Sequence, residues 1–208
     1  MTKRVITRAV VALCAAAFTA GVAGVQPSSA APAAAFPISN WNANVTTHVG
    51  ALVNTDVQIP AGHFTGNLDT DTSKLTGSMD LPPATFTYNA LGFIPTTVTF
   101  HVDETAGVDG TVNLQTGAVN VTDKFNVRLS SVKLFGIEVL DANTTCKTTT
   151  ESTATLTGTL NLSATPATVT LSGNYPIASL DGCGFLGGFV SAFTAGPTNS
   201  LDVTITAP

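Results

Sequence analysis

Apolar residues recur with a period of two over most of this 208-residue chain, and no other feature constrains its fold as strongly. In residues 98–102, for example, Val98, Phe100 and Val102 alternate with polar neighbours. Because successive side chains of a β-strand point to opposite faces, such a run predicts a strand with one buried and one wet face. No long helical period precedes residue 184. Similar alternation marks further runs, which are 53–59, 75–81, 125–129, 156–162 and 201–205.

Turn-forming residues separate these runs at the spacing expected of an all-β domain. The sequence therefore predicts a single antiparallel β-sandwich, or a partly closed barrel, of about ten to twelve short strands. Neither a linker nor a change of composition divides the runs, so residues 38–208 are expected to form one β domain. The residues before them, 31–37, are rich in alanine and proline and are expected to form a flexible lead-in.

The N-terminal part of the chain carries the pattern of a secretory signal peptide. Three basic residues precede an apolar run over 9–25, and a small-x-small cleavage site ends at Ala30. Residues 1–30 are therefore predicted to be removed during export. The expected location is secreted, either extracellular or associated with the cell envelope.

Export leaves two of the three cysteines in the mature chain, Cys146 and Cys183. Disulfides form and persist in the oxidising compartments that exported proteins reach, so these two are predicted to be bridged. The bridge would close a loop of about 38 residues and stabilise the fold by roughly 4 kcal/mol on the chain-entropy model.

Charge excludes one class of partner. Three of the eight basic residues lie in the signal, so five remain against thirteen acidic residues, a net charge of −8. Nucleic-acid binding depends on Lys and Arg that displace counterions from phosphates, and this balance speaks against it. The remaining partner classes are a cell-envelope component or an apolar small molecule.

One helix is expected, over residues 184–194. With two glycines it would not persist alone, so its apolar face must be buried against the β domain. Three interpretations stay open: the face plugs one end of the domain as core, it forms a lid over an apolar ligand pocket, or it contacts a membrane. The candidate ligand-binding residues are the apolar members of this face, Phe185, Leu186, Phe189, Val190 and Phe193.

Three carboxylates, Asp69, Asp71 and Asp80, are spaced like part of a calcium loop. The sixth position of such a loop needs glycine for its sharp turn, but Lys74 occupies it here. These residues are therefore a calcium candidate only, and neither a metal nor any other cofactor is expected. No Gly-x-Ser-x-Gly motif marks a serine nucleophile and no catalytic residues are identified, so the chain is not expected to be an enzyme.

A short motif recurs three times, as Gly-Asn-Leu-Asp at 66–69, Gly-Thr-Val-Asn at 110–113 and Gly-Thr-Leu-Asn at 158–161. Each copy precedes a predicted turn. Two interpretations remain open. The copies mark a repeated strand–turn–strand unit, or they reflect the Thr, Gly and Leu content of any run of β-hairpins.

Four segments carry a resemblance to known proteins: Thr-Gly-Ser-Met-Asp-Leu-Pro-Pro at 76–83, Cys146, Cys-Gly at 183–184, and Gly-Pro-Thr-Asn at 196–199. With the export signal, they resemble small secreted β-proteins of actinobacteria that have no assigned activity. The resemblance implies an extracellular or cell-envelope location and carries over no functional residues.

The sequence thus predicts a secreted, non-catalytic β-protein with a binding or structural role, and an apolar ligand pocket is one form that this role could take. The alternative is a β-barrel channel protein of an outer lipid layer, whose threonine-rich strand faces would line a wet lumen.

Overall fold

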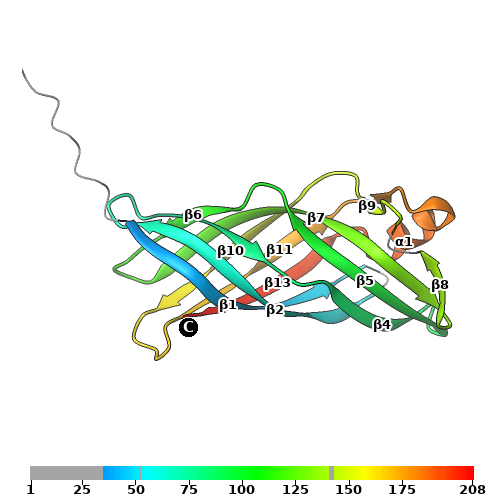
Figure 1. The fold of residues 1–208 in the computed structure, drawn as a ribbon, viewed down its shortest axis with the longest axis horizontal. Helices are drawn as coiled ribbons and strands as arrows, with labels where there is room; N and C mark the ends of the chain where they lie inside the picture. Colours follow the sequence, from blue (N-terminus) through cyan, green and yellow to red (C-terminus); the bar gives the residue numbers. More distant parts are fainter. Residues whose placement is uncertain (1–34, 52, 141–142) are drawn as a thin grey trace, which may run out of the picture. The chain divides into compact units, whose positions relative to one another are not determined.

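The computed structural model describes residues 35–51, 53–140 and 143–208, and most of this part is antiparallel β-sheet (Figure 1). The predicted signal peptide and residues 31–34 of the lead-in lie outside the described residues. The strands are β1 (Ala35–Val49), β2 (Thr55–Asp69), β3 (Lys74–Asp80), β4 (Ala84–Ala90), β5 (Ile94–Glu104), β6 (Val108–Val112), β7 (Ala118–Leu134), β8 (Ile137–Leu140), β9 (Lys147–Thr148), β10 (Ser152–Asn161), β11 (Thr168–Ile177), β12 (Leu180–Asp181) and β13 (Gly196–Thr206). The helical part consists of a 3-10 turn, η1 (Gly184–Leu186), followed by helix α1 (Gly187–Thr194).

The sheet closes on itself. Its strands follow the order β10-β11-β13-β1-β2-β3-β6-β7, and β7 pairs in turn with β10, which completes a ring of eight strands. The long strand β7 makes this possible, because residues 118–125 pair with β6 and β10 while residues 125–134 pair with β5, β8 and β9. The all-β prediction with one C-terminal helix and one disulfide is confirmed, and of the two architectures left open the closed sheet is the one observed.

Some strands are longer than predicted, because β1 and β2 have 15 residues each and β7 has 17. Pro60 accounts for part of the difference. Proline cannot donate to a sheet ladder, so it suggests a break, but here the register shifts near Pro60 and β2 continues through the irregularity. The lead-in was also predicted too long, since residues 35–37 already belong to β1 and Phe36 pairs with Leu68.

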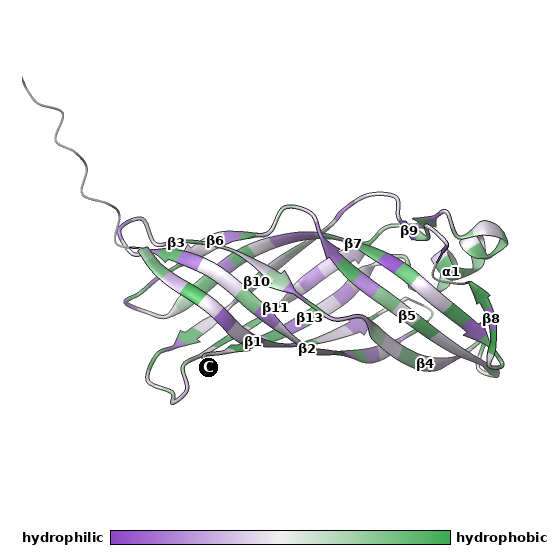
Figure 2. Cartoon of the chain, viewed as in Figure 1, coloured by the Kyte–Doolittle hydropathy of each residue, from purple (hydrophilic) through white to green (hydrophobic). Residues whose placement is uncertain are grey.

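The strand faces follow the predicted alternation. In β10, Ala154 and Leu156 are buried, whereas Thr155 and Thr157 are exposed. Figure 2 shows hydrophobic and hydrophilic residues alternating along the strands of the ring. The interior of the closed sheet is therefore an apolar core, and these threonines point outward. This is the reverse of the arrangement that the lumen-lining alternative predicts.

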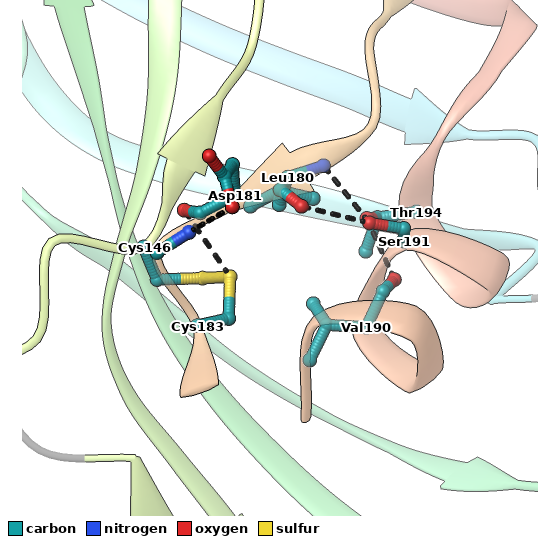
Figure 3. The surroundings of a disulfide bond; sticks show 8 residues. Cys146, Leu180, Asp181, Cys183, Val190, Ser191 and Thr194 are labelled. Atoms are coloured by element: carbon teal, nitrogen blue, oxygen red, sulfur yellow. Dashed lines mark hydrogen bonds between the residues drawn. A yellow bond between two sulfur atoms is a disulfide. The ribbon is translucent and has the colours of Figure 1, made fainter. Parts of the chain in front are cut away.

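The disulfide and the helix lie together at one end of the sheet, which we call the helix end (Figures 1 and 3). Cys146 and Cys183 are bridged with Cα atoms 4.3 Å apart, as predicted. The Ser191 hydroxyl accepts from the backbone N–H of Leu180 at 2.9 Å and donates to its carbonyl oxygen at 3.2 Å. Since the strand that contains Leu180 pairs with β9, these contacts fasten α1 to the sheet.

Candidate ligand-binding cavity

Three hairpins gather at the other end of the sheet, which we call the mouth end (Figure 1). They connect β2 to β3, β6 to β7 and β10 to β11, and each follows one copy of the repeated motif. The last residue of each copy caps its turn, because Asp69, Asn113 and Asn161 each accept hydrogen bonds through Oδ1 from the backbone N–H groups two and three residues on, at 2.9–3.1 Å. The recurring motif therefore marks a repeated structural unit.

The first glycine of each motif lies where two strands approach closely. At Gly66, a Cβ atom would lie 2.6 Å from the carbonyl oxygen of Thr76 and 2.8 Å from the Phe64 ring. Only glycine fits there without displacing its neighbours. The motif thus combines a close strand contact, an inward apolar residue and a turn cap within four residues.

The three hairpins and the start of β1 enclose a cavity of about 220 Å³, which we call the mouth cavity. Each hairpin contributes the apolar residue before its cap, the residue after the cap and the first inward residue of the returning strand. These nine are Leu68, Thr70, Leu75, Val112, Leu114, Val119, Leu160, Leu162 and Val169, and β1 adds Phe36, Ile38 and Trp41. All but Thr70 are apolar.

The rim of the mouth cavity includes apolar side chains that are exposed in the part of the chain that the structure describes. Phe36 is 52% exposed, Leu162 64% and Leu114 39%. Side chains as exposed as these bury little apolar surface when the protein folds, so they contribute little to its stability. A dry apolar cavity of about 150 Å³ already binds benzene in another protein, so the mouth cavity has room for a small apolar ligand.

A second, smaller cavity of about 40 Å³ lies deeper in the sheet, and we call it the inner cavity. It shares five of its lining residues with the mouth cavity, which are Ile38, Trp41, Leu75, Val119 and Val169. Its lining includes one charged residue, Asp123 of β7. The mouth cavity therefore leads inward to a carboxyl group.

Asp123 is 9% exposed, and its Oδ1 atom has no hydrogen-bond partner. Burial raises the pKa of its carboxyl group, an effect that a hydrogen bond from the backbone N–H of Lys124 opposes. Glu104 is an acidic group that interacts with Asp123. Burial also raises the pKa of Glu104. The backbone N–H of Met79 donates to Glu104 Oε1 at 3.0 Å and opposes this rise, whereas the charge of Asp123 increases it.

The helix residues predicted to bind a ligand lie away from both cavities. Leu186, Val190 and Phe193 are buried and Phe189 is half-buried, so this face packs as a plug of the helix end. The centre of the Phe193 ring lies 4.6 Å from the centre of the Phe189 ring and 6.3 Å from the centre of the Tyr88 ring. Beneath the helix is a cavity of about 60 Å³, to which α1 contributes only Thr194.

Phe185 does not belong to this buried face, because it is 87% exposed. The prediction assumed α-helical geometry from residue 184 onward. Phe185 instead lies in the 3-10 turn η1, where each residue turns the chain by about 120° and not 100°. Its side chain therefore points away from the residues that share its face on an α-helical wheel.

The three carboxylates of the calcium candidate do not come together. Asp69 pairs with Lys74 at one end of β3, while Asp80 pairs with His63 at the other end, six residues away or about 20 Å along the strand. Hydrogen bonds within the turn, first of all from Thr72, lower the pKa of Asp69. Within the described residues, no group of three or more His, Cys, Asp or Glu side chains is arranged to hold a metal ion.

Other charged residues pair with each other on the outside of the sheet. Arg128 donates to both carboxylate oxygens of Asp103 at 2.8 and 3.2 Å, and the ammonium of Lys74 lies 3.0 Å from a carboxylate oxygen of Asp109. The ring of His101 lies on the strand beside Arg128, and burial is the main cause that lowers its pKa, followed by the guanidinium.

Sequence reasoning missed the mouth cavity, although it recorded the motif that builds it. Two signals could have located the site. Leucine follows the turn cap in two of the three copies, at Leu114 and Leu162, where polar residues are usual. Asp123 interrupts an inward series of apolar residues in β7, between Val121 and Phe125, and therefore falls on the core face by period two.

A different set of apolar residues is exposed at the helix end. The β4–β5 turn contains Leu91 and Phe93, exposed by 63% and 69%, and the β7–β8 turn contains Phe135, exposed by 64%. The two turns are adjacent, since the N–H of Phe135 donates to the carbonyl of Pro95 at 3.0 Å. Leu91 and Phe135 have positive φ angles of 55° and 52°, a conformation that bulky residues rarely adopt.

Among the described residues, none of the helices has the length and hydrophobicity needed to span a lipid bilayer. No protein family, curated protein or solved structure matches this chain. The resemblance to secreted actinobacterial β-proteins therefore remains a prediction from the sequence.

Proposed function

We propose that this is an exported, non-catalytic protein that binds a small apolar ligand in the mouth cavity. The observation that carries the proposal is the mouth cavity itself: it is open at the hairpin end, about 220 Å³ in volume, and lined by apolar side chains apart from Thr70. Binding sites for small molecules are typically concave and mostly apolar, and they favour the mouths of closed sheets. The three repeated hairpins give the site a rigid frame.

The size of the cavity limits the ligand. Sites for drug-sized molecules usually exceed about 300 Å³, so the mouth cavity suits a single hydrocarbon chain or a small ring system. Its exposed rim leaves room for part of such a ligand to project beyond the hairpins. We therefore assign the mouth cavity to one hydrocarbon chain of a lipid-like molecule and not to a bulky cofactor.

Export is the second part of the proposal. The basic and apolar pattern of residues 1–30 supports it, and so does the Cys146–Cys183 disulfide, because such bonds are rare in reducing compartments. The mature protein is then extracellular or associated with the cell envelope. Mass spectrometry of the exported protein should find its N-terminus within residues 31–36; an intact Met1 outside the cell would contradict export.

Trp41 provides a direct test of binding, because it lines the mouth cavity and is the only tryptophan of the chain. The purified domain is titrated with N-phenyl-1-naphthylamine, an apolar dye that accepts energy from tryptophan. We expect saturable quenching of Trp41 together with rising dye emission. Absence of saturable transfer would overturn the proposed function.

A cavity-filling variant locates the dye. Val169→Phe adds a ring at the wall shared by the two cavities and should weaken dye binding at least tenfold. The matched control is Val139→Phe in β8, where the same change is made at the helix end and dye binding should stay as in the parent protein. Equal loss in both variants would place the dye elsewhere.

The exposed turns at the helix end support a second candidate function, which is contact with a lipid surface. Leu91 and Phe135 are bulky residues at positive φ angles, and their side chains are exposed. Neither the needs of the turn nor packing in the core explains why large apolar residues stand at these positions. Flotation with phosphatidylcholine vesicles tests this function. The parent protein should float with the vesicles, and a Phe93→Ser/Phe135→Ser variant should remain in the dense fraction; equal behaviour of the two would contradict it.

A further inference from the structure

A buried carboxyl group without a full set of partners requires an explanation, because leaving a charged or polar atom unpaired in the core is costly. Among the described residues, the buried side-chain atoms that lack a hydrogen-bond partner are Oδ1 of Asp123 and Oγ of Ser152. The two residues lie on neighbouring strands. Asp123 pairs with Ala154, and Ser152 is two positions along β10 on the same inward face.

Asp123 lines the inner cavity, which shares part of its wall with the mouth cavity. It is the third inward residue of β7 counted from the hairpin, after Val119 and Val121, and Val119 lines both cavities. Asp123 lies four positions after Val119, which is about 13 Å along the strand. A ligand chain that fills the mouth cavity and continues inward would end at this carboxyl group.

The charges around Asp123 are negative. No ion pair of the described residues includes it, and the acidic group that interacts with it is Glu104. The inner cavity is otherwise lined mainly by apolar side chains, including Phe64, Met79 and Leu156. A negative, apolar-walled pocket disfavours a carboxylate or phosphate and favours a group that donates a hydrogen bond.

We propose that Asp123 receives the inner end of the ligand and that this end is a hydroxyl or ammonium group. The inference rests on the proposed function and names the ligand class more closely: a single-chain amphiphile bound with its hydrogen-bond-donating head at Asp123 and its hydrocarbon chain in the mouth cavity. A hydroxyl can donate to the free Oδ1 atom, and an ammonium group donates with the added attraction of opposite charge. A fatty acid is disfavoured because its carboxylate would lie beside the Asp123 carboxyl group, which lines the inner cavity.

Four ligands of equal chain length test the assignment by displacement of N-phenyl-1-naphthylamine at pH 7: 1-decanol, decylamine, decanoate and n-decane. We expect 1-decanol and decylamine to bind about tenfold more tightly than n-decane, the effect of one good hydrogen bond to a buried carboxyl group. Decanoate should bind more weakly than n-decane. Equal affinities for all four would overturn the role of Asp123 while leaving apolar binding intact.

Substitution of Asp123 completes the test. In Asp123→Leu, 1-decanol, decylamine and n-decane should bind within about twofold of one another, while dye binding itself persists. Asp123→Asn keeps one acceptor oxygen and should retain preference for 1-decanol but lose that for decylamine. The control is Asp109→Leu, which removes an exposed carboxylate from neighbouring β6 without touching either cavity.

The outcomes separate the inference from the function on which it rests. Preference for alcohol and amine that survives Asp123→Leu would overturn the inference alone. Failure of every ligand to displace the dye, or failure of the dye to bind, would overturn the proposed function and the inference with it. Loss of the preference in Asp109→Leu as well would show a general charge effect and would also overturn the inference.

Discussion

The two ends of the closed sheet are built in opposite ways. At the helix end a disulfide, a helix and two short strands close the sheet (Figure 3). Asn199, which is fully buried, accepts from the N–H of Gly50 at 3.0 Å and donates to the carbonyls of Tyr175 and Gly196 at 3.3 and 2.9 Å. At the mouth end no helix of the described residues covers the core, apolar side chains form an open cavity, and Asp123 further inside keeps an unpaired oxygen.

The difference between the two ends suggests that one end mainly stabilises the fold and the other mainly binds the ligand. A domain needs only one well-sealed end and a packed interior to fold, so the other end can carry an apolar cavity and a buried carboxyl group at some cost in free energy. In this molecule the covalent and hydrogen-bonded supports are concentrated at the helix end. Changes there are therefore expected to affect folding, and changes at the mouth are expected to affect binding.

Removal of the disulfide should have the largest effect. The Cys146→Ala/Cys183→Ala variant frees a loop with a sequence separation of 37 and should lose about 4 kcal/mol of unfolding free energy. Urea unfolding of the exported protein measures the loss. If the variant were as stable as the parent, the helix end would not be the main support of the fold.

Truncation of the helix plug should come next. Phe193 is 4% exposed, and Phe193→Ala should cost about 3 kcal/mol through lost burial and the cavity that it leaves. Phe185→Ala is the matched control within the same segment. Because Phe185 is 87% exposed, that variant should unfold at nearly the parent urea concentration; equal losses would mean that the helix does not plug the sheet as described.

Leucine substitutions of the two buried polar residues should have effects of opposite sign. Asn199→Leu leaves one N–H and two carbonyl groups unpaired and should destabilise the domain by about 2 kcal/mol. Asp123→Leu removes an unpaired buried carboxyl and should stabilise it by about 1 kcal/mol at pH 8. Urea unfolding of both variants checks the signs, and two losses of similar size would remove the contrast between the ends.

The gain in Asp123→Leu should depend on pH. The folded-state pKa of Asp123 is raised above the ordinary value of 3.8, so the folded protein holds this proton more tightly than the unfolded chain does. Its contribution to stability is therefore full below pH 3.8 and is lost as pH rises through the raised pKa. Glu104, whose pKa is also raised, acts in the same direction and remains in the variant. The advantage of the leucine variant should be smaller at pH 4 than at pH 8; a constant advantage would contradict a buried, titrating Asp123.

The sequence predicted the helix end better than the mouth end. Cys146 and Cys183 form the expected bridge, and residues 184–194 contain the expected helical segment. Both are local features: export implies oxidation, and a helical period is visible within eleven residues. Within this segment the side-chain direction of Phe185 was predicted wrongly, because a 3-10 turn changes the angular spacing.

The mouth cavity could not be predicted in the same way, because it depends on strands that are distant in sequence. Its lining brings Phe36 of β1 together with Leu162, more than a hundred residues later. Their place around one cavity follows from closure of the sheet, which the β7–β10 pairing completes, and a strand pattern alone does not reveal which strand is the last neighbour. The repeated motif gave the three hairpins, but not the fact that they meet around one space.

The smallest change in stability is expected at the rim of the mouth. Leu162 is 64% exposed, so Leu162→Ser should alter the free energy of unfolding by no more than about 0.5 kcal/mol. The same change removes an apolar wall of the mouth cavity and should weaken binding of N-phenyl-1-naphthylamine about fivefold.

Ile137→Ser is the control for this change. Ile137 is 69% exposed at the helix end and lines neither the mouth nor the inner cavity, so its replacement should change neither stability nor dye affinity. Comparing the two variants isolates the effect of lying at the mouth end or at the helix end, because both residues are aliphatic, exposed and placed at hairpin tips. If Leu162→Ser bound the dye as tightly as Ile137→Ser, the rim leucines would be ordinary exposed residues and the mouth would have no role in binding. A loss of dye affinity confined to Leu162→Ser would mean that the rim leucines contribute to ligand binding and not to the stability of the fold.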